Sequence, residues 1–275
     1  MLKKLLKYDL KAVLKYWWIA ALSSVALSFA GGWSISVFVN EKELPIALYV
    51  VATIVAIAVV LGISMFYFVT AIFIYTRFYK NFFTDEGYLT FTLPVKRTQL
   101  LNSKLITSII TSSLTGLIVV IDFFIAFFIG TSDLIDKNDF SLMWDELLHT
   151  PIDNFVLYLV IYVIEALLLL LLCEILATLF VFSCITIASI ITKKAKIITA
   201  IGIYYVANSI VSSLLSIFWL FGVGSIGYWM DSIPENYVFP VFALLLLMCI
   251  LFMGILCTAF YSLQYWMLDR KLNLS

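Results

Sequence analysis

Apolar residues fall in six long runs separated by short polar stretches. A lipid hydrocarbon core of about 30 Å needs about 20 helical residues. Each run reaches that length, and the second and fourth exceed it, so we expect those two to tilt or project from the bilayer. The runs lie at 17–39, 46–75, 105–130, 155–190, 197–223 and 239–262.

Composition agrees with this pattern. Of 275 residues, 64% are hydrophobic and 12% are charged, with a mean hydropathy of +1.09. Soluble domains are about half apolar and about a quarter charged. The sequence therefore predicts an all-α integral membrane protein, with six transmembrane helices in one transmembrane domain spanning residues 1–275.

The basic residues predict the orientation of the chain. Of 17 lysines and arginines, only Lys42 and Lys137 fall in the loops of one side, which leaves 15 on the other. Positive loops stay in the cytoplasm. We therefore expect both termini to be cytoplasmic.

The first 16 residues form a second pattern. At 100° per residue, five lysines share an arc of 120°, and leucines occupy much of the opposite side, with Asp9 as an exception. This segregation favours an amphipathic helix lying in the cytoplasmic membrane interface, with its lysines near anionic headgroups. A charged flank that only sets topology is the alternative.

Several chemistries are excluded or unsupported. There is no G-x-x-x-x-G-K-[ST] phosphate loop, and His149 is the only histidine, so neither ATP hydrolysis nor H-E-x-x-H zinc chemistry is expected of this chain. The net charge is zero, which gives no sign of nucleic-acid binding. All four cysteines lie in apolar runs without disulfide or zinc spacing. We expect no enzyme, no metal site and no cofactor bound by the chain itself.

The loop at 76–104 is too polar to span a membrane and contains the run FFTDEGYLTFTLPVKRTQLLNSKL. Thr84 can cap a short helix, Pro94 can end it, and Thr98 can cap the next span. The predicted cytoplasmic helix would expose apolar side chains, which need lipid or a protein partner. These side chains are Phe82, Phe83, Tyr88, Leu89 and Phe91.

This loop resembles the coupling loop of bacterial type-two ABC exporter permeases, in particular small Firmicutes-type members with a D-E-G-Y-L-T-F-T-L-P run before the third span. The six spans and the basic N-terminal helix fit the same family. The resemblance implies a permease subunit in the bacterial cell membrane that pairs with a second permease copy, the same or different. It also implies that two copies of a separate ABC ATPase bind ATP and magnesium and drive the permease.

Carried over by position, the resemblance places the ATPase contacts in the loop. In the family, the helix after the second span docks in a groove on each ATPase. The alternative is a loop that rests on the membrane by its aromatic residues. The implied coupling residues are Phe83, Asp85, Glu86, Gly87, Tyr88, Leu89, Thr90, Phe91 and Pro94.

Small and polar residues form stripes along three spans, which indicates either close helix packing or a translocation path. The resemblance implies that spans one and five form the dimer contact, and that spans two and five flank the path. We assign Ser209 and Ser213 of span five to the path. The stripes are Ala20, Ser24, Ser28 and Gly31 in span one; Ser108, Thr111, Ser112, Thr115 and Asp122 in span three; and Gly202, Tyr205, Ser209, Ser212, Ser213 and Ser216 in span five.

Three acids lie inside the apolar runs, namely Asp122, Glu165 and Glu174. Ionisable groups at membrane depth are costly and are often functional. Glu165 and Glu174 are nine residues apart, or half a turn out of phase, so they cannot both face one narrow path unless the helix breaks. We assign Asp122 and Glu165 to the path, while interhelical hydrogen bonding stays an alternative.

The predicted function is export, and two alternative functions stay open. The family resemblance and the apolar, aromatic-rich spans favour an amphipathic peptide as cargo, such as a bacitracin-like or lantibiotic peptide or a phenol-soluble modulin, with antimicrobial peptide resistance as one role. The first competitor is a proton-coupled secondary transporter that uses Asp122 and Glu165. The second is a membrane scaffold that transports nothing.

Overall fold

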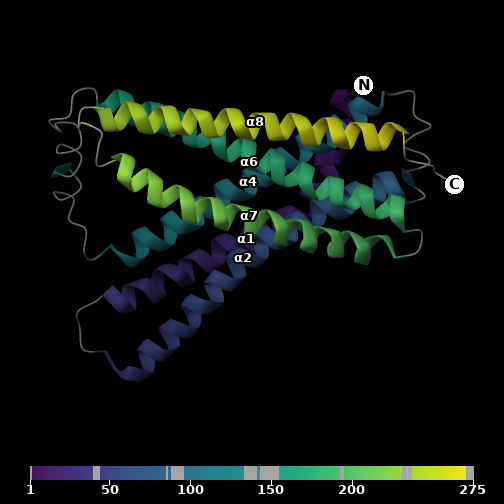
Figure 1. Cartoon of the computed structure of the whole chain (residues 1–275). Helices are drawn as coiled ribbons and strands as arrows, with labels where there is room; N and C mark the ends of the chain where they lie inside the picture. The colour runs from purple at the N-terminus through teal and green to yellow at the C-terminus, as the bar shows by residue number, and fades with distance from the viewer. Residues whose placement is uncertain are drawn as a thin grey trace. The chain divides into compact units, whose positions relative to one another are not determined.

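The structure is a computed structural model that describes residues 2–39, 44–84, 86–87, 96–132, 141–142, 155–192, 195–230, 234 and 237–270. Within these residues, every apolar run is a long α-helix, so the all-helical class and the six membrane-spanning candidates are confirmed (Figure 1). The helices are α1 (Leu2–Val39), α2 (Ile46–Phe83), α4 (Arg97–Gly130), α6 (Phe155–Ile191), α7 (Lys196–Met230) and α8 (Val238–Arg270).

The helices are longer than a bilayer requires. They contain 33 to 38 residues, which corresponds to about 50 to 57 Å at 1.5 Å per residue. Large apolar side chains such as Ile54, Phe68 and Leu167 are more than 60% exposed along them. Side chains of this kind are stable against lipid but not against water. The chain is therefore a multi-pass membrane protein.

Helix boundaries differ from the sequence prediction in every helix but α6. Helices α7 and α8 continue to Met230 and Arg270, beyond the predicted ends at 223 and 262. The segment at 1–16 is not separated from the first span, because α1 continues without interruption from Leu2 to Val39. Helix α2 extends to Phe83, and α4 begins at Arg97. The predicted loop at 76–104 is therefore reduced to the residues between 83 and 97, because helix formation continues past the point where the chain stops being apolar.

The chain divides into two compact units, and α2 and α4 each continue from one unit into the other. Unit 1 contains residues 1–77 and 106–152, and unit 2 contains residues 78–105 and 153–275. In unit 1, Trp17, Ala21 and Phe66 form a buried cluster against Leu114 and Ile118. The Trp17 indole donates to the Thr115 hydroxyl at 2.9 Å, and that hydroxyl is 3.3 Å from the Thr70 hydroxyl.

Small residues bring the helices of unit 1 close together. Ser24 and Ser28 of α1 are 1% and 0% exposed. A Cβ added to Gly32 would lie 2.6 Å from the Cβ of Ile129, and one added to Gly130 would clash with Ile35. The backbones of α1 and α4 therefore approach where neither glycine has a side chain. The predicted stripes of spans one and three are packing faces in this unit.

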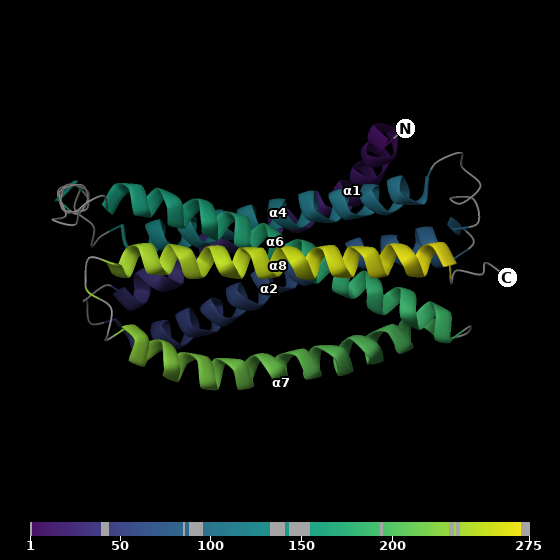
Figure 2. The same cartoon turned by 45° about the horizontal axis from the view of Figure 1, so that its top comes forward.

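In unit 2, α6 packs along α8 and, over a shorter stretch, against α7 (Figure 2). The Tyr162 hydroxyl of α6 donates to the Phe239 carbonyl of α8 at 2.7 Å, and the rings of Tyr158 and Phe239 stack. Phe180 contacts both Tyr204 of α7 and Phe260 of α8 edge to face. Helix α6 therefore forms the centre of this unit.

Candidate functional site

An aromatic cluster supports the start of the predicted coupling loop. The rings of Phe78 and Phe182 stack at 3.7 Å with an interplanar angle of 5°, and Phe78 also contacts Phe82 and Phe83. Phe82 is 1% exposed and Phe83 is 8% exposed. The prediction that these two side chains face the cytosol is wrong, because both rings pack with Phe78, which itself stacks on Phe182 of α6.

A tight turn follows the aromatic cluster. The Thr84 hydroxyl donates to the Lys80 carbonyl at 2.6 Å, and the Gly87 N–H donates to the Thr84 carbonyl at 2.7 Å. A Cβ at Gly87 would lie 2.8 Å from the carbonyl oxygen of Phe82, which is a backbone atom that cannot rotate away. Thr84 therefore closes the end of α2, and the turn requires a glycine at position 87.

A polar network holds the turn against the beginning of α4. With its amide oriented to match both partners, Asn81 donates to Glu86 Oε2 at 3.1 Å and accepts from the ammonium of Lys104. Lys104 is 7% exposed. A buried ammonium is stable only with polar or charged partners, so Lys104 requires this network. The network joins residues on either side of the loop.

The other end of the loop is fixed to α8. The Arg97 guanidinium donates to the carbonyls of Leu268 and Asp269 at 2.8 Å each and forms an ion pair with the Asp269 carboxylate at 3.4 Å. At the first end of the loop, Lys196 of α7 donates to the carbonyl of Phe83, the last residue of α2, at 3.3 Å. Both cations bind carbonyl groups at the C-terminal end of a helix, where the helix dipole favours positive charge.

Helix α4 begins two residues before the position expected for a helix capped by Thr98. The N–H groups of Gln99 and Leu100 donate to the Lys96 carbonyl at 2.9 and 3.3 Å. Thr98 was predicted to cap this helix, but it lies within the first turn. Lys96 occupies the capping position instead, because Arg97 is held by α8 and is already helical.

Two hydrogen bonds, one part-buried and one buried, join the neighbouring helices of unit 2. The Tyr261 hydroxyl of α8 donates to Asn102 Oδ1 of α4 at 2.8 Å, and Gln264 of α8 donates to the Thr186 hydroxyl of α6 at 2.7 Å. Gln264 and Thr186 are both 0% exposed. Side-chain hydrogen bonds of this kind hold helices together in an apolar surrounding.

We call the aromatic cluster, the turn at 84–87, the Lys104 network and the Arg97 contacts the loop base.

The loop base includes only part of the predicted coupling set. Phe83, Glu86 and Gly87 belong to it, with Phe83 buried and Glu86 exposed. The remaining predicted residues lie outside the described residues, so their role stays a prediction. These residues are Asp85, Tyr88, Leu89, Thr90, Phe91 and Pro94.

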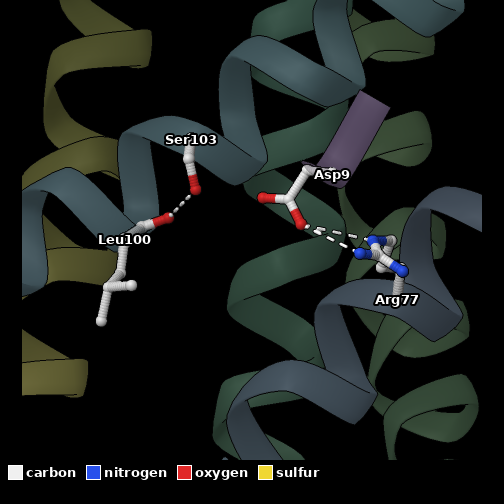
Figure 3. A network of polar contacts seen from close by, with 4 residues as sticks. All are labelled: Asp9, Arg77, Leu100 and Ser103. Atoms are coloured by element: carbon white, nitrogen blue, oxygen red, sulfur yellow. Dashed lines mark hydrogen bonds and ion pairs between the residues drawn. The ribbon is translucent and has the colours of Figure 1, made fainter. Parts of the chain in front are cut away.

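A separate ion pair lies in unit 1. The Arg77 guanidinium donates from Nε and from one terminal nitrogen to Asp9 Oδ1, at 3.3 and 3.2 Å (Figure 3). The Asp9 side chain is 6% exposed and that of Arg77 is 33% exposed. Asp9 interrupted the apolar face of the N-terminal segment, and this pair explains why. Figure 3 also shows, in unit 2, the Ser103 hydroxyl donating to the Leu100 carbonyl at 2.9 Å.

We expect Asp9→Asn to destabilise the chain, because it leaves Arg77 without its anionic partner. The loss should be on the order of 2 kcal/mol, since Asp9 is buried but Arg77 is partly solvated. The charge-swapped pair Asp9→Arg with Arg77→Asp should recover part of the loss. Thermal unfolding of the purified variants measures this, and equal stability of Asp9→Asn and the wild type would contradict it.

The predicted path residues lie in both units. In unit 1, Asp122 of α4 is 0% exposed, and neither carboxylate oxygen has a hydrogen-bond partner among the described residues. Ser24 of α1 interacts with this carboxyl group, but its hydroxyl donates to the Ala21 carbonyl at 3.0 Å. In unit 2, Glu165 of α6 is 9% exposed, and its Oε2 likewise has no partner in the described residues.

The span-five stripe differs from the other two. Ser209, Ser212, Ser213 and Ser216 are exposed, and the last three hydroxyls donate to carbonyls of α7 itself. A Cβ at Gly202 would meet nothing within 4 Å. This face of α7 therefore makes no close side-chain packing with the rest of the described chain, and its assignment to a path stays a prediction.

Sequence reasoning missed the anchoring residues of the loop base. Lys104 and Asn81 of the loop base, and Gln264 of α8, showed no distinctive pattern, because they have partners that are distant in sequence. Outside the loop base, Asp9 of unit 1 did carry a signal, as the one acid on an apolar face. No group of three or more histidine, cysteine or acidic side chains that could hold a metal ion occurs in the described part of the chain.

Comparison with known proteins finds no family model, no curated protein and no solved structure that matches this chain.

Proposed function

We propose that the chain is the permease subunit of an ATP-driven exporter in the bacterial cell membrane, with both termini in the cytoplasm. The observation that carries the proposal is the loop base. It fixes both ends of a short loop to α6, α7 and α8 through aromatic, hydrogen-bonded and ionic contacts. A loop that only connects two spans needs no such support, whereas a loop that transmits force does.

In this proposal the loop binds an ABC ATPase, and two copies of that ATPase serve a pair of permease chains. The ATPase binds ATP and magnesium and supplies the driving force. Movement of the loop passes into α2 and α4, because both helices continue directly from it. It also passes into α6 through Phe182 and into α8 through Arg97 and Tyr261. The residues of the chain itself transmit motion and perform no bond chemistry.

The proposed cargo is an amphipathic peptide. Charged side chains are scarce within the spans, and the exposed surfaces of the helices are aliphatic and aromatic. A pathway between such helices suits a molecule with its own apolar face better than a hydrophilic solute. The exposed serine face of α7 is where we place contact with the cargo or with the second permease copy.

Co-purification tests the proposal. The chain should retain a co-expressed ABC ATPase through detergent extraction, and an amphipathic peptide should stimulate ATP hydrolysis by the reconstituted complex. A scrambled peptide of equal composition but without an amphipathic face is the control. A chain that binds no ABC ATPase, while it remains folded and inserted, would overturn the proposal.

One observation favours a second candidate, a proton-coupled transporter. Asp122 and Glu165 are buried carboxyl groups with oxygens that lack partners among the described residues, as groups that exchange protons can be. A proton-coupled carrier would accumulate substrate under an imposed pH gradient without an ATPase. An ATP-driven exporter would show no transport in vesicles under that condition.

We expect Glu165→Gln to alter peptide-stimulated ATPase activity several-fold more than Glu174→Gln. Helix α6 is continuous between the two positions, so the carboxyl groups point to opposite sides. Glu165 is 9% exposed, whereas Glu174 is only half-buried. The activities of both variants are measured at matched expression. Equal activity of both variants and the wild type would make these acids structural.

A further inference from the structure

The first four turns of α1 have a lysine side and a protein side. At 100° per residue, Asp9 and Val13 lie opposite the lysines and Trp17 lies about 100° from the centre of the lysine arc, and each of the three is 4% exposed. The lysines are all exposed. They are Lys3, Lys4, Lys7, Lys11 and Lys15.

Specific contacts fix the rotation of this segment about its axis. Asp9 pairs with Arg77 of α2, and the Trp17 indole donates to the Thr115 hydroxyl of α4. The apolar side of the segment is therefore bound to protein and is not available to lie in lipid. The lysines must project away from the helices of unit 1.

Depth in the membrane separates the lysines from one another. The apolar part of α1 begins at Trp17, so Lys15 and Lys11 lie about 3 and 9 Å before it along the helix, while Lys3 lies about 21 Å away. Each headgroup layer is about 5–8 Å thick, and charge is screened over about 8 Å at physiological salt. With α1 along the membrane normal, Lys15 lies within this layer and Lys11 lies at its outer edge, still within one screening length, whereas Lys3 and Lys4 lie more than one screening length beyond it.

We propose that Lys11 and Lys15 bind anionic phospholipid headgroups of the leaflet at the N-terminal end of α1, and that the Asp9–Arg77 pair holds them in that orientation. Charge complementarity selects the occupant, because lysines beside a lipid surface attract phosphate groups that carry net negative charge. The inference does not depend on an ATPase partner.

The test uses the purified chain alone in nanodiscs of phosphatidylcholine, with and without 30% phosphatidylglycerol. Lipid that binds the folded state raises the unfolding temperature. The measured quantity is the rise in unfolding temperature that phosphatidylglycerol produces. Each lysine should contribute about 1 kcal/mol to this stabilisation, so we expect the rise to be smaller by roughly 4–8 °C in the double variant Lys11→Gln with Lys15→Gln. The matched control, Lys3→Gln with Lys4→Gln, should keep the wild-type difference.

Each outcome decides the proposal. An unchanged lipid difference in the Lys11/Lys15 variant, or an equal loss in the Lys3/Lys4 variant, overturns it. A wild-type rise produced by soluble glycerol phosphate in pure phosphatidylcholine would assign the site to small phosphates and would also overturn it. Asp9→Asn leaves every lysine in place, so a full lipid difference in that variant would remove the orienting role of the ion pair. Equal unfolding temperatures of the lysine variants in pure phosphatidylcholine confirm that the fold is intact.

Discussion

Replacing Gly87 with alanine is expected to abolish ATPase docking while the chain stays inserted in the membrane. The new Cβ would lie 2.8 Å from the oxygen and 2.9 Å from the carbon of the Phe82 carbonyl. Neither atom can move without displacing the end of α2. The turn at 84–87 must therefore open, which costs on the order of 1–3 kcal/mol and moves every loop residue after it.

The measurement is the affinity of the purified permease for its ATPase, which should fall at least tenfold. The matched control is Gly116→Ala in α4, where a Cβ would meet nothing within 4 Å and alanine favours the helix. Wild-type affinity in Gly87→Ala would show that the turn does not position the docking surface. Loss of affinity in Gly116→Ala as well would point to general damage.

Phe78→Ala is expected to be the most destabilising single change in unit 2. The ring is 1% exposed and stacks on Phe182, which is 0% exposed, so its removal leaves a cavity that neighbouring helices cannot easily fill. Deletion of a buried phenyl ring costs about 3–5 kcal/mol. Phe123→Ala is the control, because that ring is 67% exposed and leaves no cavity.

A double-mutant cycle isolates the stacking contact. Phe78→Ala and Phe182→Ala each remove the stacked pair, so the double variant should cost less than the sum of the two by about 0.5–1.5 kcal/mol. Reversible unfolding in detergent measures all four proteins. Strict additivity would mean that the two rings contribute independently. Because these variants loosen the loop base, we also expect them to reduce peptide stimulation of ATP hydrolysis more than they reduce ATPase docking.

The spans were predictable because hydropathy reports the lipid environment directly. All six apolar runs are helices, and on the side away from the predicted loop five of them end within one residue of the expected position, while α7 continues seven residues farther, to Met230. The half-turn offset of Glu165 and Glu174 also followed from the sequence, since α6 contains no proline or glycine between them and is continuous. Both inferences need only local information.

The loop base was not predictable for the opposite reason. Phe82 and Phe83 stand among charged residues and looked like surface residues, but they pack with Phe78, whose stacking partner Phe182 lies about 100 positions away. The contact of Arg77 with Asp9, 68 positions away, likewise depends on how the chain folds back on itself. Hydropathy also placed helix ends at the edge of the apolar runs, although helices such as α1 and α2 continue beyond them.

Site-specific photo-cross-linking tests the central claim most directly. A photoreactive amino acid at Tyr88 is placed in the loop that the loop base supports, and one at Lys137 serves as the control in a loop predicted to lie across the membrane. Irradiation of cells should link the Tyr88 variant, but not the Lys137 variant, to an ABC ATPase identified by mass spectrometry. Cross-links from Tyr88 to lipid alone, at normal expression of the ATPase, would contradict the account.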